Sequence, residues 1–281
     1  MTVFLMMLAV TACYTVTSLN DKYASSGIKF SGSEFTFLIC SSMTVFLMFS
    51  LPFQKIHFTL TWQSFAAVLL IAVCKLLEFY MSILVLRQLS AFELKAWLGI
   101  TLFASYITDV IYGAPISLLK LMCIVITVVG LIFIVRSGEK KEIDYKKLVL
   151  PLVLYLTAKY GYGLVIKSFS EYASPTMQLL PALALISLVL LPKAAPWKMI
   201  KNEPRGTVIV MLARIPNTIG MLIENAIISI SLGSYSFIQP MILVSLFIIA
   251  LIRREQYLKL NLIGGVICIC GVILFQTVGN I

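Results

Sequence analysis

Five ionisable side chains lie deep inside long apolar stretches of this chain. Lys75 and Glu78 share one stretch, Lys159 lies in a second, and Arg214 and Glu224 lie in a third. A charge at the centre of a membrane helix costs about 2.5–3.5 kcal/mol on insertion scales, and such residues usually mark a pathway or a binding site. Three of the five are cations and two are anions. The excess cation suits a solute that carries a carboxylate or phosphate.

Each of the five predicts a chemical role. The planar guanidinium of Arg214 fits a carboxylate or phosphate, and Lys159 can hold the same acid group. Glu78 and Glu224 can bind an amine or carry a proton. Because Lys75 and Glu78 are three residues apart, they share a helical face and can instead form an ion pair that neutralises itself. In that alternative, Lys159 and Arg214 still need partners.

Proline, glycine and aromatic residues accompany the two central cations. In Arg214-Ile215-Pro216-Asn217, the proline removes a backbone donor and predicts a break or a kink. The freed carbonyls could line a cavity, although a purely structural kink is the alternative. Lys159-Tyr160-Gly161-Tyr162-Gly163 combines a cation, aromatic rings and flexible backbone. The candidate site thus has substrate-binding residues and hinges: Lys75, Glu78, Lys159, Tyr160, Arg214, Asn217 and Glu224 for binding, and Pro216, Gly161 and Gly163 as hinges.

The elements that position these residues are apolar segments of membrane-spanning length. Of 281 residues, 60% are hydrophobic and 12% are charged, and the mean hydropathy is +1.00. A soluble domain has about 25% charged residues, so the bilayer must solvate most of this chain. Strand-type alternation is absent, which leaves helices as the spanning structure. The sequence predicts ten transmembrane helices: 2–19, 34–51, 62–86, 91–112, 116–135, 148–166, 176–192, 207–229, 235–252 and 260–279.

The two halves of the chain resemble each other, which indicates an internal repeat. At an offset of 141 residues, the small residues Cys123, Thr127 and Gly130 align with Gly264, Cys268 and Gly271. At an offset of 146 residues, Glu78 aligns with Glu224, and the segment 11–14 aligns with 157–160. We predict two five-helix repeats, 1–140 and 141–281. Because five is odd, the halves enter the membrane from opposite sides, as in transporters with a midplane site. The small residues predict close helix packing.

Residues 76–135 and 222–278 resemble the EamA-type repeat of the drug/metabolite transporter superfamily. The resemblance rests on Arg254-Glu255, Gly264, the ending Gly271-Val272-Ile273-Leu274, and Pro240 within its helix. The first copy departs from the pattern, with Ala114 where the family usually has glutamate and Gly99 in place of Pro240. The resemblance implies an all-α polytopic membrane protein with ten helices in two inverted five-helix repeats. It specifies no substrate.

The loop charges predict an orientation. Nearly all loop Lys and Arg residues lie in the first, third, fifth, seventh and ninth connections, whereas the other connections hold Lys55 and Lys167, with Lys120 at their edge. The positive-inside rule places the basic set in the cytosol and both termini outside. The family resemblance implies termini inside, so the two arguments disagree.

We therefore expect a secondary active transporter that moves a small zwitterionic or anionic metabolite, such as an amino acid, by alternating access. Its expected partners are the solute, the lipid bilayer, and a coupling proton or counter-substrate. The alternatives are a carrier of a larger phosphorylated or lipid-linked sugar, and a non-transporting scaffold or receptor. A lone His57 argues against an enzyme. The Cys and His positions suggest no metal site or cofactor, and no basic aromatic surface indicates nucleic acid. The expected location is the cell membrane, most simply a bacterial inner membrane.

Overall fold

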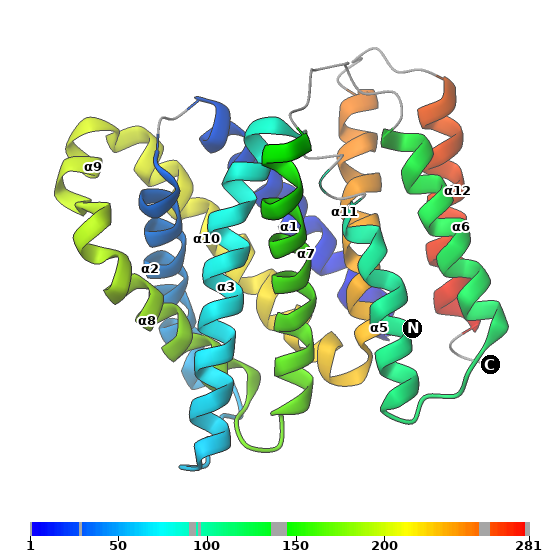
Figure 1. The fold of residues 1–281 in the computed structure, drawn as a ribbon, viewed down its shortest axis with the longest axis horizontal. Helices are drawn as coiled ribbons and strands as arrows, with labels where there is room; N and C mark the ends of the chain where they lie inside the picture. Colours follow the sequence, from blue (N-terminus) through cyan, green and yellow to red (C-terminus); the bar gives the residue numbers. More distant parts are fainter. Residues whose placement is uncertain are drawn as a thin grey trace.

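The computed structural model describes residues 2–27, 30–89, 94, 97–135, 145–252 and 259–278, and it is built from helices (Figure 1). The helices are α1 (Thr2–Gly27), α2 (Gly32–Ser50), α3 (Trp62–Gln88), α5 (Thr101–Ile111), α6 (Leu118–Val135), α7 (Tyr145–Ser168), α8 (Pro175–Ala194), α9 (Pro196–Asn202), α10 (Pro204–Ile230), α11 (Leu232–Ile252) and α12 (Lys259–Val278). Short 3-10 helices occupy Leu51–Phe53 and Leu98–Ile100. The prediction of an all-α fold is confirmed.

The helices have the lengths and the composition of a multi-pass membrane protein. In the described part of the chain, seven helices are long and apolar enough to cross a bilayer. Three shorter apolar helices, Leu98–Ile111, Leu118–Phe133 and Ile263–Phe275, lie where the fourth, fifth and tenth segments were predicted. Large apolar side chains such as Leu69 and Leu188 are exposed on the outside of the bundle, as expected for a surface in contact with lipid.

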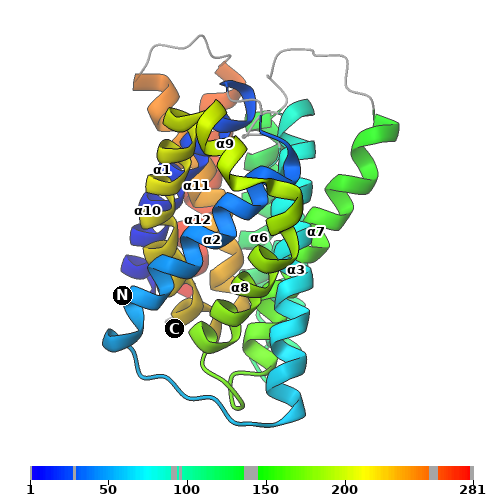
Figure 2. The ribbon, with the colours of Figure 1, turned by 90° about the vertical axis from the view of Figure 1, so that its left-hand side faces the viewer.

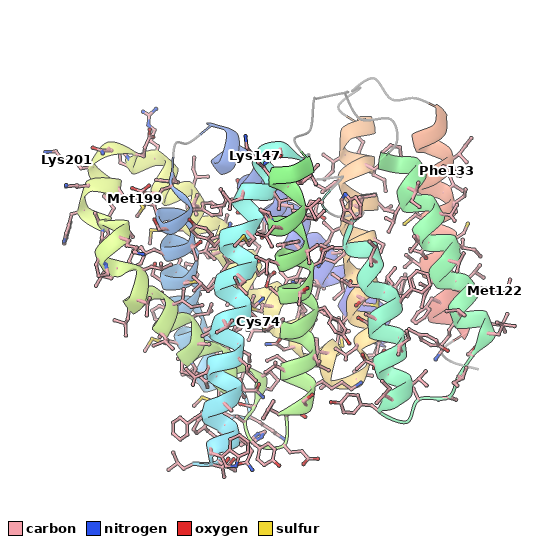
Figure 3. All side chains as sticks on the ribbon, viewed as in Figure 1. Cys74, Met122, Phe133, Lys147, Met199 and Lys201 are labelled. Atoms are coloured by element: carbon pink, nitrogen blue, oxygen red, sulfur yellow. The ribbon has the colours of Figure 1, made fainter. Side chains whose placement is uncertain are left out.

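One helix was not predicted. Helix α9 follows α8 directly, through Ala195 in the left-handed region (φ 40°) and with Pro196 in its first turn. Within α9, the side chain of Met199 is buried, whereas Trp197 is 85% exposed. Lys201 of the same helix points away from the bundle (Figure 3). This distribution is typical of a short helix at a membrane surface.

The long helices alternate in direction, so their connections gather at two ends (Figures 1 and 2). We call the end at which α1, α6 and α11 end and α2, α7 and α12 begin, together with α9, the loop end. Helix α1 begins and α12 ends toward the opposite end, which we call the terminal end (Figure 1). There, the α2–α3 and α7–α8 connections touch, since the Ser174 amide donates to the His57 carbonyl at 2.9 Å. The described helix ends next to the connections of the predicted basic set thus lie toward one end of the bundle.

Helix α6 packs directly against α12. A Cβ atom added to Gly130 would lie 2.6 Å from the backbone nitrogen of Cys268, and one added to Gly271 would lie 2.9 Å from the backbone nitrogen of Thr127. The two backbones therefore touch at the predicted small-residue stripes, which confirms the close approach. The contacts pair the later stripe residues of one helix with the earlier ones of the other, so the two helices run antiparallel.

Candidate functional site

Four of the five predicted ionisable residues meet in the middle of the bundle. The Nζ atom of Lys75 lies 2.8 Å from a Glu78 oxygen, both on α3. Lys159 of α7 lies 3.2 Å from the other Glu78 oxygen and 3.4 Å from a Glu224 oxygen on α10. Lys75 and Glu224 are fully buried. Buried charges of this kind must be paired, and here Lys159 joins the carboxylates of the two halves.

Aromatic side chains complete this central charge cluster. The Tyr14 hydroxyl of α1 donates to Glu224, and the Tyr235 hydroxyl of α11 donates to the Lys159 carbonyl at 3.1 Å. The ammonium of Lys75 lies 3.6 Å from the centroid of the Tyr162 ring. The Tyr14 phenol and the Tyr162 ring therefore contact buried charges directly, and Tyr235 fixes the backbone of Lys159.

Arg214 lies apart from the central cluster and has a partner that the sequence analysis did not consider. Its guanidinium contacts the carboxylate of Asp21 on α1, and its Nε donates to the Val210 carbonyl at 3.3 Å. Among the described residues, Asp21 balances the third cation, so the predicted excess of positive charge is wrong. Asp21 was missed because the predicted first segment ended at residue 19, whereas α1 continues to Gly27.

A cavity connects the central cluster to the Arg214–Asp21 pair. Its volume is about 100 Å³. Its walls include charged and polar residues from both halves of the chain: Tyr14, Asp21, Lys75, Glu78, Lys159, Arg214, Asn217 and Gln239. Glu224 is not in the wall but lies behind Lys159. We call this space the central cavity.

Two predicted binding residues have other contacts. The amide of Asn217 faces the central cavity and donates to the Met43 sulfur at 3.1 Å. Tyr160 is absent from the cavity wall, and its hydroxyl is hydrogen-bonded to Thr108 of α5. Tyr14, which aligns with it in the sequence, reaches the cluster instead. The match at an offset of 146 residues was a signal that could have nominated Tyr14.

The predicted break at Pro216 is wrong. Helix α10 continues without interruption from Pro204 to Ile230, with Pro216 inside it. A proline removes a single backbone donor, and neighbouring helices can support the chain on either side of such a position. Here α1 and α2 pack against α10. Because α10 is not broken at Pro216, its backbone carbonyls are not freed there to line the cavity.

The predicted glycine hinges also lie inside one continuous helix, α7. A Cβ atom on Gly163 would lie 2.8 Å from a ring carbon of Tyr235, and one on Gly161 would lie 3.3 Å from the sulfur of Cys74, which faces α7 (Figure 3). Both glycines allow α7 to approach its neighbours closely. This packing brings Lys159 within reach of both glutamates.

No protein-family model matches this chain, and no curated protein sequence matches it. The resemblance to EamA-type repeats therefore stays a prediction. Arg254 and Glu255, on which it partly rests, lie outside the described residues.

Proposed function

We propose that this protein is a secondary active transporter that carries a small zwitterionic metabolite, such as an α-amino acid, by alternating access. The observation that carries the proposal is Lys159. Its ammonium lies between Glu78 of the first half and Glu224 of the second half, at the edge of a cavity that both halves line. A membrane scaffold has no need for such a costly buried arrangement.

The helix packing supports two inverted repeats of five helices. The correspondence, in chain order, is of α1, α2, α3, α5 and α6 with α7, α8, α10, α11 and α12. Exchanging the two halves then converts the α3–α7 contact into the α10–α1 contact. Both contacts are extensive, and the α2–α8 and α6–α12 contacts exchange with themselves. The glycine contacts are related in the same way. Gly130 approaches Cys268, and the aligned residue Gly271 approaches Thr127, which aligns with Cys268. Halves related in this way can exchange conformations and open a central cavity to alternate faces.

The balance of charge favours a zwitterion over a simple anion. The cavity and the central cluster contain three cations and three anions: Lys75, Lys159, Arg214, Asp21, Glu78 and Glu224. A solute with one ammonium and one carboxylate can exchange partners with Lys159 and the two glutamates without leaving a net buried charge, which would be costly. The carboxylate would face Lys159, and the ammonium would face Glu78 or Glu224.

By the positive-inside rule, the loop end faces the cytosol, and the protein is a multi-pass protein of the cell membrane. A proton could accompany the solute on Glu78 or Glu224, or a second solute could return in exchange. Exchange of one zwitterion for another preserves the charge balance of the site, whereas a bound proton adds one positive charge to it.

A ligand screen by thermal stabilisation tests the solute class, because a solute that binds the folded protein raises its apparent stability, by about 2.7 kcal/mol at a hundredfold excess over Kd. The purified protein is heated with α-amino acids, their amides, their N-acetyl derivatives and sugar phosphates. We expect stabilisation by a free amino acid, and much less by its amide or its N-acetyl derivative. Stabilisation by sugar phosphates alone would instead favour a carrier of phosphorylated sugars.

A further inference from the structure

A second ionic network lies at the terminal end, outside the central cluster. Asp109, near the end of α5, accepts hydrogen bonds from Lys167 of α7 at 2.6 Å and from Ser231 at 2.8 Å. It also accepts from the backbone amides of Leu232 at 3.0 Å and Gly233 at 2.8 Å, which begin α11. One carboxylate of the first half thus holds two helices of the second half.

This network closes over a second cavity. Asp109 and Lys167 lie in its wall with Tyr112, Lys120 and Ser234. None of these residues lines the central cavity. Lys167 is eight residues after Lys159 on α7, about 12 Å further toward the terminal end. The second cavity therefore lies nearer the terminal end than the solute site does, and its lining is distinct from that of the central cavity.

One member of each outer ion pair occupies a related position, whereas the partners Asp109 and Arg214 do not. Lys167 and Asp21 are separated by 146 residues, the offset that relates Glu224 to Glu78. Each forms an ion pair with the other half: Lys167 with Asp109, and Asp21 with Arg214. Arg214 precedes Glu224 by ten residues on α10, about 15 Å toward the loop end. One inter-half ion pair thus lies on each side of the central cluster.

We propose that these two pairs are the alternating latches of the transporter, with Asp109–Lys167 closing the terminal end and Asp21–Arg214 closing the loop end. The proposal rests on the alternating-access function proposed above. Asp109 and Asp21 are positioning residues, because each pairs with a cation on a helix of the other half, although Asp21 also lies in the wall of the central cavity. Breaking one latch favours the conformation that is open at that end, and it closes the opposite end to the same extent, because the two conformations share one equilibrium.

The test measures the accessibility of each cavity without requiring transport. In a cysteine-free background, a single cysteine replaces either Ser234, in the wall of the second cavity, or Ser18, in the wall of the central cavity. A membrane-impermeant maleimide then labels the protein in lipid nanodiscs, and the labelling rate is measured. We expect Asp109→Asn to raise the rate at position 234 and lower it at position 18, each by about fivefold or more. Asp21→Asn should change both rates in the opposite direction.

Two further variants keep the test decisive. Lys120→Met alters a wall residue of the second cavity that does not contact Asp109, so it should leave both rates unchanged. Lys167→Met preserves the hydrogen bonds from α11 to Asp109, and it should shift the rates in the same direction as Asp109→Asn if that variant fails to fold. A rise at both positions, or a change confined to the mutated end, would mean that the pairs only hold the fold together, and it would overturn the proposal. Loss of transport with reciprocal labelling intact would count against the proposed solute and not against the latches.

Discussion

At the scale of single residues, Lys159 makes the most important contacts of the central cluster. It is the one side chain of the central cluster that contacts carboxylates from both halves. Lys75 contacts only Glu78 among these carboxylates and is further stabilised by the Tyr162 ring. Removing one partner of a buried pair costs about 3–5 kcal/mol, because the other charge stays buried and unpaired.

This difference predicts the order of stability of two neutralising variants. Lys159→Met should lower the unfolding temperature of the detergent-purified protein more than Lys75→Met does, since it leaves two carboxylates without their shared cation. Adding Glu224→Gln to Lys159→Met should recover part of the loss, because one uncompensated charge is removed. Thermal unfolding followed by intrinsic fluorescence provides the comparison. An equal loss in both single variants would show that Lys159 is no more central than Lys75.

Some of these residue contacts could be predicted from sequence. The repeat offset aligns Glu78 with Glu224, and these two carboxylates share Lys159 as a partner, although Glu224 is not in the cavity wall. Asp21 could not be found in this way, because it lies after the polar residues that end the first apolar run, and only the extended α1 brings it to Arg214. Tyr14 aligns with Tyr160 at the same offset, but only the packing of α1 against α10 shows that it contacts Glu224.

At the scale of elements, the apolar segments were predicted closely, whereas their details depend on tertiary contacts. Helix α9 is too short to be recognised from hydropathy, and α7 and α10 remain continuous where glycine and proline predicted breaks. Packing against neighbouring helices overrides these local preferences. The small-residue stripes were informative because they constrain backbone contact directly.

The α6–α12 contact predicts a sharp difference between two glycines. Gly130→Ala places a Cβ atom against the α12 backbone, which cannot move aside easily, and overpacking of this kind costs about 1–3 kcal/mol. Gly265→Ala, on α12 itself, meets only the Phe247 ring at 3.1 Å, which can adjust. We expect a clear drop in unfolding temperature for Gly130→Ala and a small change for Gly265→Ala. Similar values for both would contradict the direct backbone contact.

At the scale of the whole molecule, the helices alternate in direction, so the helix ends next to the predicted basic connections lie toward the loop end. Helix α1 begins and α12 ends toward the terminal end (Figures 1 and 2). The positive-inside rule then predicts an external carboxyl terminus. A reporter fused after Ile281 that fluoresces only in the cytosol should stay dark, while one that is active only outside should report. The opposite result would support the orientation implied by the family resemblance.

The central claim is that the two halves move a zwitterionic solute past Lys159 and its two glutamates. Solute counterflow in proteoliposomes tests it most directly, using a labelled amino acid identified by thermal stabilisation. We expect the wild-type protein to accumulate label against an internal unlabelled pool, and Glu224→Gln and Glu78→Gln to reduce this at least about tenfold, a loss of about 1.4 kcal/mol. Cys270→Ser, at an exposed position of α12, should retain wild-type flux. Absence of counterflow from a folded wild-type protein that binds the solute, or undiminished flux in both glutamine variants, would contradict the account.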